Sequence, residues 1–153
     1  MEKEEKKELL GAKEQPNIMK KIYDLLKQKE DDIELCFEAN NIEGASVGLY
    51  SETGAVYLKK NILGGFKALV PFILRYKATP KTDKARLAMM DYLNNLSEWL
   101  VSQERPELSG ERTVELIEQT ELTYLEFVND DGSITYSAKF ELKYRNTERT
   151  GRK

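Results

Sequence analysis

Histidine is absent from this chain of 153 residues, and cysteine occurs once, at Cys36. Without histidine the chain lacks the commonest general base, the commonest metal ligand and every Ser-His or Cys-His catalytic pair. A single cysteine excludes an internal disulfide and any cysteine-rich metal site. We therefore predict that the protein is not an enzyme, and we expect no catalytic residues, no metal site and no cofactor.

Motifs that carry chemistry are also missing. The nine glycines match neither GxxxxGK[ST] nor GxGxxG spacing, so turn formation accounts for them. No GxSxG or Ser-x-x-Lys context marks a nucleophile. Two carboxylate pairs, Asp31-Asp32 and Asp130-Asp131, fall in turn contexts that favour aspartate. Hydrolase chemistry would instead need carboxylates that converge from separate elements in a shielded cleft.

Long apolar runs are missing as well. Crossing a bilayer takes roughly 20 apolar residues, and a signal peptide needs an apolar core that residues 1–7 lack. The formal net charge of -3 predicts no strong overall attraction to nucleic acid. We expect a globular protein in the cytoplasm of the producing cell, with neither a membrane nor a nucleic acid as partner.

The composition along the chain predicts three regions. Residues 1–15 read as a flexible charged leader, with a docking arm that orders on assembly as the alternative. Residues 16–146 suit a single domain with one core. Residues 147–153 form a basic, solvated C-terminal tip.

Two stretches alternate with period two and predict long strands of one sheet, each with a dry face and a wet face. Pro71 lies inside the first stretch, and because it cannot donate to a ladder it predicts an edge or a bulge there. The apolar positions are Phe66, Ala68, Val70, Phe72, Leu74 and Tyr76 in the first stretch, and Ile134, Tyr136, Ala138, Phe140, Leu142 and Tyr144 in the second.

Helical spacing occurs twice. Pro16, with Asn17 as a competing cap, opens an amphipathic helix that ends near Lys29, and Thr82 or Asp83 caps a second helix that runs to about residue 103. Shorter strands are expected at residues 33–37, at 47–50 and 55–60 joined as a hairpin, and from about residue 112. Residues 118–128 fit either a bulged strand or an extended loop. The predicted fold class is α+β, a mixed and mainly antiparallel sheet with two principal helices packed on it.

Several local phrases add a family resemblance. They are IMKKIYDLL at 18–26, GGFKALVPFILRYK at 64–77, LNNLSEWL at 93–100, IEQT at 117–120, DG at 131–132 and YSAKFELKYR at 136–145. Together they resemble the minor capsid or tail-completion proteins of long-tailed phages and of prophages in low-GC Gram-positive bacteria. The likeness covers roughly residues 16 to 146, and the leader departs from the family.

The resemblance implies a tail-terminator fold and a virion structural role. Such proteins form a ring, usually a hexamer, that caps the tail tube and presents it to the head connector. The implied partners are the chain itself, tail-tube proteins and head-connector proteins. The implied locations are the host bacterial cytoplasm during assembly and then the head–tail junction. Candidate subunit or tube contacts are Glu43, Tyr50, Glu52, Lys59, Lys60, Lys139, Lys143 and Arg145.

A second hypothesis comes from the wet positions of the two long strands. If these strands pair, their basic side chains form one face that a monomeric cytosolic binding module would use for RNA or a small ligand. Salt-sensitive nucleic-acid binding by a monomer would distinguish it from self-association or tail binding. The basic residues are Lys67, Arg75, Lys77, Lys139, Lys143 and Arg145.

Overall fold

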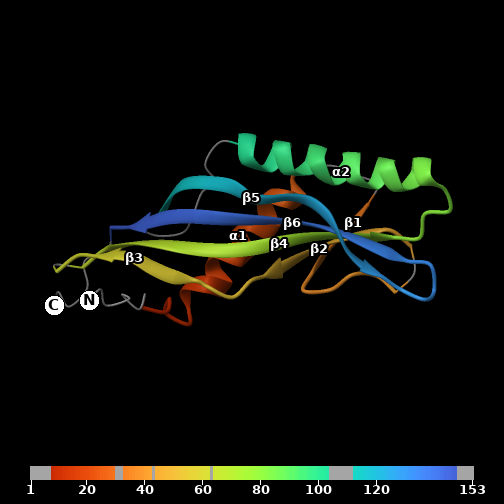
Figure 1. The fold of residues 1–153 in the computed structure, drawn as a ribbon. Coiled ribbons are helices and arrows are strands. Elements are labelled where there is room, and N and C mark those ends of the chain that lie inside the picture. The colour runs from red at the N-terminus through yellow and green to blue at the C-terminus, as the bar shows by residue number, and fades with distance from the viewer. Residues whose placement is uncertain (1–7, 30–32, 43, 63, 104–111, 148–153) are drawn as a thin grey trace, which may run out of the picture.

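The computed structural model describes residues 8–29, 33–42, 44–62, 64–103 and 112–147. The fold is α+β, as predicted: two helices pack on an open, mostly antiparallel sheet of six strands (Figure 1). The elements are α1 (Glu14–Lys27), β1 (Glu34–Phe37), β2 (Ser46–Ser51), β3 (Val56–Lys60), β4 (Phe66–Ala78), α2 (Asp83–Ser102), β5 (Arg112–Val128) and β6 (Ile134–Asn146).

The two long alternating stretches form the centre of the sheet. β4 and β6 pair antiparallel along their whole length, from Phe66 opposite Asn146 to Ala78 opposite Ile134. The strand order is β1-β2-β4-β6-β5, with β1 and β2 parallel and the other pairs antiparallel. The prediction that both stretches belong to one sheet is confirmed.

The expected hairpin between residues 47–50 and 55–60 is wrong. β2 and β3 do not pair with each other in the sheet; both pair with β4, β2 along Phe72–Lys77 and β3 along Phe66–Leu69. Pro71 lies at the break between them, where its carbonyl accepts a hydrogen bond from Glu52 N at 3.3 Å. Because the amide and carbonyl of one strand residue point to the same neighbour, the missing donor faces this break. Proline is therefore tolerated inside a central strand.

Both helices cover the same face of the sheet, which we call the helix face. The apolar positions of β4 and β6 are buried there against Ile18, Ile22 and Leu26 of α1 and Leu93 and Leu100 of α2. Burial of these side chains is the main stabilising contribution, at about 25 cal/mol for each Å² of apolar area removed from water. The helix stripes that the sequence shows are therefore core.

The helix boundaries lie within two residues of the predictions, and α1 ends at Lys27 where an end near Lys29 was predicted. α1 begins at Glu14, two residues before Pro16, which therefore lies within the first turn. α2 begins as predicted, since the Thr82 hydroxyl accepts a hydrogen bond from Ala85 N at 3.1 Å and caps the helix.

The last residues of the expected flexible leader lie along β3. Leu10 N donates to Ala55 O at 3.0 Å, and Tyr57 N donates to Glu8 O at 3.0 Å. This pairing covers the outer edge of β3, and it leads directly into α1. Residues 1–7 and most of the basic tip, 148–153, lie outside the described residues.

β5 settles the alternative that the sequence left open: residues 118–128 are part of a bulged strand, not a loop. The strand is 17 residues long and its pairing with β6 shifts register four times. Bulges bend a strand and increase its twist, and β5 curves along the sheet in Figure 1. We call the side of the sheet that faces away from the helices the open face. The curved strand β5 partly covers this face. Thr135 and Ser137 are buried, although their positions were expected to be wet.

Candidate functional site

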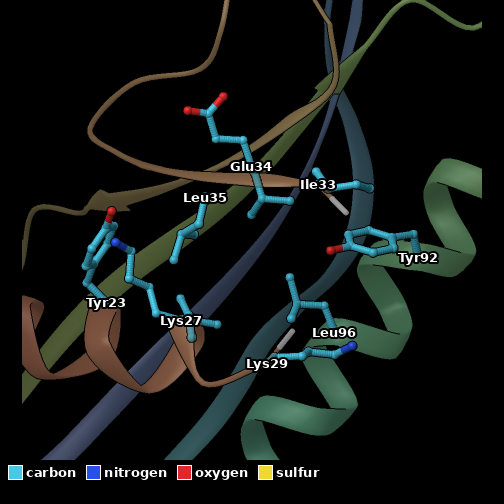
Figure 2. Close-up of a pocket in the computed structure, with 10 residues that line it drawn as sticks. Tyr23, Lys27, Lys29, Ile33, Glu34, Leu35, Tyr92 and Leu96 are labelled. Atoms are coloured by element: carbon cyan, nitrogen blue, oxygen red, sulfur yellow. The ribbon is translucent and has the colours of Figure 1, made fainter. Parts of the chain in front are cut away.

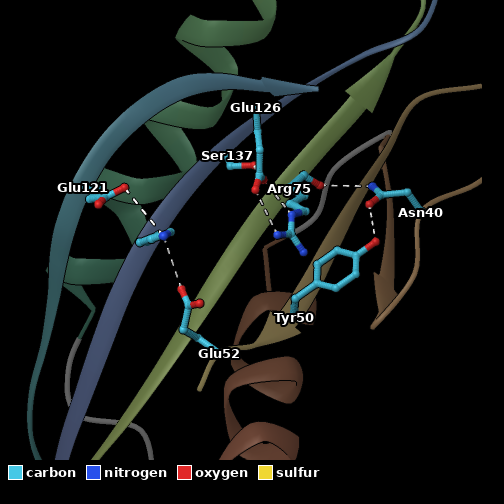
Figure 3. A network of polar contacts seen from close by, with 8 residues as sticks. Asn40, Tyr50, Glu52, Arg75, Glu121, Glu126 and Ser137 are labelled. Atoms are coloured by element: carbon cyan, nitrogen blue, oxygen red, sulfur yellow. Dashed lines mark hydrogen bonds and ion pairs between the residues drawn. The ribbon is translucent and has the colours of Figure 1, made fainter. Parts of the chain in front are cut away.

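The open face carries a ladder of opposite charges. Four of its carboxylates come from β5 and pair with cations of β4 and β6. Lys139 contacts both Glu121 at 4.0 Å and Glu52 at 3.7 Å (Figure 3). The other pairs are Lys67–Glu115 at 3.7 Å, Lys143–Glu118 at 3.6 Å and Arg75–Glu126 at 2.8 Å. The cations that the second hypothesis places on this face are therefore largely paired, because β5 brings its glutamates beside them.

Arg75 lies at the centre of the network in Figure 3. Its guanidinium donates two hydrogen bonds to Glu126, at 2.8 and 3.2 Å. It also stacks over the ring of Tyr50, 4.6 Å from the centroid, and lies 5.6 Å from that of Phe127. Ser137 donates a further hydrogen bond to Glu126. Arg75 thus joins β2, β4 and β5 across the open face.

Asn40 fastens the segment after β1 onto the same network. Its amide donates to the carbonyl oxygens of Ser46 and Arg75, each at 3.1 Å. The Tyr50 hydroxyl donates to Asn40 Oδ1 at 2.6 Å. Gly48 lies beneath this segment, since an added Cβ would stand only 2.3 Å from Ala39 O. The sequence analysis named neither Asn40 nor Gly48 as part of a site, because their contacts depend on the chain crossing β2.

The Arg75–Glu126 pair predicts a pH-dependent contribution to stability. The hydrogen bonds from Arg75 lower the pKa of Glu126, so the contribution is complete above the unfolded-state pKa of about 4.3. It is lost as the pH falls through the lower folded-state pKa. We expect Glu126→Gln to reduce the free energy of unfolding by about 1 kcal/mol at pH 7, and we expect this difference to shrink as the pH falls below the unfolded-state pKa of Glu126. Urea titrations of the wild type and the variant from pH 7 into the acid range, monitored by Trp99 fluorescence, measure this difference in unfolding free energy. A difference that does not change with pH would contradict the role given to the Arg75–Glu126 pair.

The outer edge of β5 is the second feature of interest. Within the described chain β5 pairs with β6 alone, so the backbone groups on its other side have no strand partner. Large apolar side chains are exposed along it, namely Leu116 at 44%, Leu122 at 78%, Leu125 at 45%, Phe127 at 47% and Val128 at 65%. Soluble proteins usually blunt such edges with charged side chains, proline, β-bulges or a covering segment. This edge has glutamates and four register shifts, but it has neither lysine nor proline, and no other described strand covers it.

Two hollows flank β1 at the opposite end of the sheet. The larger, about 520 Å³, lies between α1, β1 and α2 (Figure 2). Lys27 and Glu34 at its rim give it a mixed polar and apolar character. The smaller, about 220 Å³, is almost wholly apolar and is lined by Pro16, Lys20, Tyr23 and Phe37.

The predicted contact residues are divided between separate places. Tyr50, Glu52 and Lys139 lie together in the network of Figure 3, and Lys143 pairs with Glu118 on the same face. Arg145 is exposed on that face opposite Lys67.

The remaining predicted contacts lie elsewhere. Lys59 and Lys60 are exposed on β3, where Lys60 pairs with Glu8 at 2.8 Å and lies 4.9 Å from the ring centroid of Tyr57. Glu43 lies outside the described residues. The sequence analysis missed the β5 edge. The apolar residues after Glu118 were its only signal, and spacing alone did not show that they are exposed.

Comparison with known proteins adds no family: no family model matches the chain, and no curated protein matches it. In the part of the chain that the structure describes, no group of three or more His, Cys, Asp and Glu side chains is placed to hold a metal ion. None of the described helices is long and apolar enough to cross a membrane. Functional inference therefore rests on the surfaces described above and on the resemblance of the local phrases.

Proposed function

We propose that this protein is a structural virion subunit at the phage head–tail junction, a tail terminator or minor capsid protein that forms a ring on the tail tube. The observation that carries the proposal is the long edge of β5, which exposes large apolar side chains and which no other described strand covers. The resemblance of residues 64–77 and 136–145 to phage tail-completion proteins supplies the biological setting. In the fold these two phrases lie in the paired central strands.

An uncovered edge of this length supports an assembly role. Unpaired backbone groups next to exposed Leu and Phe side chains favour pairing with another chain, and repeated pairing between identical subunits is how rings form. Four cations of the open face, Lys67, Arg75, Lys139 and Lys143, already pair with carboxylates of the same subunit, which suits a rigid building block. Partners would be further copies of the chain, the tail tube and the head connector.

The alternative of RNA binding by a monomer is not favoured by this surface. Nucleic-acid affinity comes largely from cations that are free to neutralise phosphates. On the open face Lys67, Arg75, Lys139 and Lys143 each lie beside a carboxylate. Binding a phosphate backbone here would place it against the four glutamates of β5.

The proposed function predicts self-association. Native mass spectrometry and light scattering over a concentration series, with and without magnesium, should show a closed ring, with a hexamer as the expected form. A closed ring is difficult to explain for a monomeric binding module. Addition of purified phage tail tubes should then give capped tubes. A protein that stays monomeric at every concentration and also leaves the tubes unbound would contradict the proposal.

A further inference from the structure

The sheet ends in two open edges that differ from each other. In the described chain β5 forms one end of the strand order and β1 forms the other. The outer side of β3 is partly covered, because residues 8–10 pair with residues 55–57 at its start. The two ends of the strand order, β5 and β1, are therefore the main places where a strand could add to this sheet.

The C-terminal part of β5, residues 122–128, has the composition of a strand that pairs readily with another strand. Residues 122–128 read LTYLEFV, with one charged residue, three β-favouring aromatic or branched residues in the last five, and no glycine or proline. Leu122 and Val128 are the most exposed large side chains of β5. Burying such a Leu or Phe side chain in an apolar site is favourable.

The β1 edge offers a site that fits such side chains. The small hollow beside it is apolar and, at about 220 Å³, large enough for one Leu or Phe side chain. Phe37, the last residue of β1, forms one wall and is 47% exposed. Its ring meets that of Tyr23 edge to face, 6.2 Å between centroids, which fixes the shape of the hollow.

We propose that residues 122–128 of β5 add to the β1 edge of a second copy of this chain, seating a β5 apolar side chain in the hollow between Pro16, Tyr23 and Phe37. The inference rests on the proposed ring and specifies its subunit contact. Because the two surfaces differ, the contact is head-to-tail, which is the geometry that closes rings. The sheet would then continue from one subunit into the next.

Charge distinguishes this contact from the pairing of two β5 strands. β5 carries Glu115, Glu118, Glu121 and Glu126 with Arg112 as its only cation. Antiparallel pairing of two copies would bring these glutamates close to one another, and like charges on facing strands are destabilising. At the β1 end Lys20 lines the small hollow and Lys27 lines the larger one, beside the single glutamate of β1, Glu34. The β1 end therefore offers the β5 glutamates nearby cations, which the edge of a second β5 strand does not.

The single native cysteine gives a direct test. Cys36 lies in β1 and is partly exposed, so Leu122→Cys places a second thiol on the opposite edge of each subunit. In the full-length protein, a short thiol-reactive bifunctional reagent should link Cys36 of one copy to the new thiol of the next. The expected product is a covalent ladder of dimers, trimers and larger species up to the ring size. Both cysteines are required for it, so Leu122→Cys with Cys36→Ser should give no ladder.

A second variant tests the same contact without chemical cross-linking. Leu122→Lys adds a charged residue to the β5 edge, and it should shift the native mass from ring to monomer. Its thermal midpoint should equal that of the wild type when both are measured at a concentration at which both are monomeric. The matched control is Leu87→Lys on α2, a leucine that is 62% exposed, which should leave the ring intact.

The outcomes separate the contact from the function. Efficient dimers from Leu122→Cys with Cys36→Ser would overturn the inference in favour of β5–β5 pairing. The inference would also be overturned if the wild type forms a ring, the Leu122→Lys variant keeps that ring, and the Leu122→Cys variant gives no cross-linked ladder. The proposed function would stand in that case. A wild-type protein that neither forms rings nor binds tail tubes would overturn the proposed function itself.

Discussion

Replacing Gly48 by alanine is expected to lower the free energy of unfolding by about 3 kcal/mol. An added Cβ would lie 2.3 Å from Ala39 O, 2.6 Å from the Tyr50 ring and 2.9 Å from Asn40 Oδ1. Ala39 O is a backbone atom held by its neighbours, so it cannot move aside as a flexible side chain would. The substitution would lift the Asn40 segment off β2 and break its hydrogen bonds to Ser46 and Arg75. Urea denaturation of both proteins at pH 7 measures the change.

Gly11→Ala is the matched control for this prediction. Its nearest contact would be the Tyr57 hydroxyl at 3.1 Å, which is the far end of a side chain. Loss of stability should therefore stay below about 1 kcal/mol. If Gly48→Ala were as mild as Gly11→Ala, the segment over β2 would not be fixed in the way described here.

Glu14→Ala is the second substitution with a large expected effect, again about 3 kcal/mol. Glu14 accepts two hydrogen bonds from Arg112, at 2.9 and 2.6 Å, and one from the Tyr144 hydroxyl at 2.8 Å. The side chains of the ion pair are only 16% and 13% exposed, and Tyr144 is fully buried. Without the Glu14 carboxylate, the Arg112 guanidinium and the Tyr144 hydroxyl would lose this hydrogen-bond partner. Both groups would stay largely buried under the start of α1, where water replaces the lost hydrogen bonds poorly. Thermal and urea unfolding measure the loss.

A double-mutant cycle with Arg112→Met tests the cause. If the loss comes from an unpaired buried charge, the double variant should be more stable than the sum of the two single losses implies. Glu8→Ala is the control, because the Lys60–Glu8 pair is exposed, and it should have no measurable effect. Strict additivity of Glu14→Ala and Arg112→Met would contradict the pairing.

The elements that the sequence predicted well are those whose signal is local. β6 and β4 were predicted from alternation alone, because each buries one face along its length. The cap at Thr82 depends on a hydroxyl three residues from the amide that it accepts from, so residue type and spacing suffice to place it. Both helix stripes were predicted as core for the same reason.

The errors fall where distant segments meet. The hairpin between residues 47–50 and 55–60 was predicted from a short connection, but β4 is long enough to pair with both strands end to end. The open face was expected to be basic because the second hypothesis considered only the cations of the two long strands. Its neutralising glutamates lie more than 40 residues from Lys67 or Arg75 in the chain, and only the pairing of β5 with β6 brings them there.

The sequence by itself determined the class of the fold, the central strand pair, the two helices and the absence of histidine chemistry, because all of these follow from residue type and short-range period. Only the tertiary structure decided which apolar surfaces remain exposed to solvent. Whether an apolar residue such as Leu93 or Leu122 becomes core or exposed edge depends on what packs against it, and periodicity cannot supply that in a bulged strand. The β5 edge, which carries the proposed assembly, is therefore visible only in the folded chain.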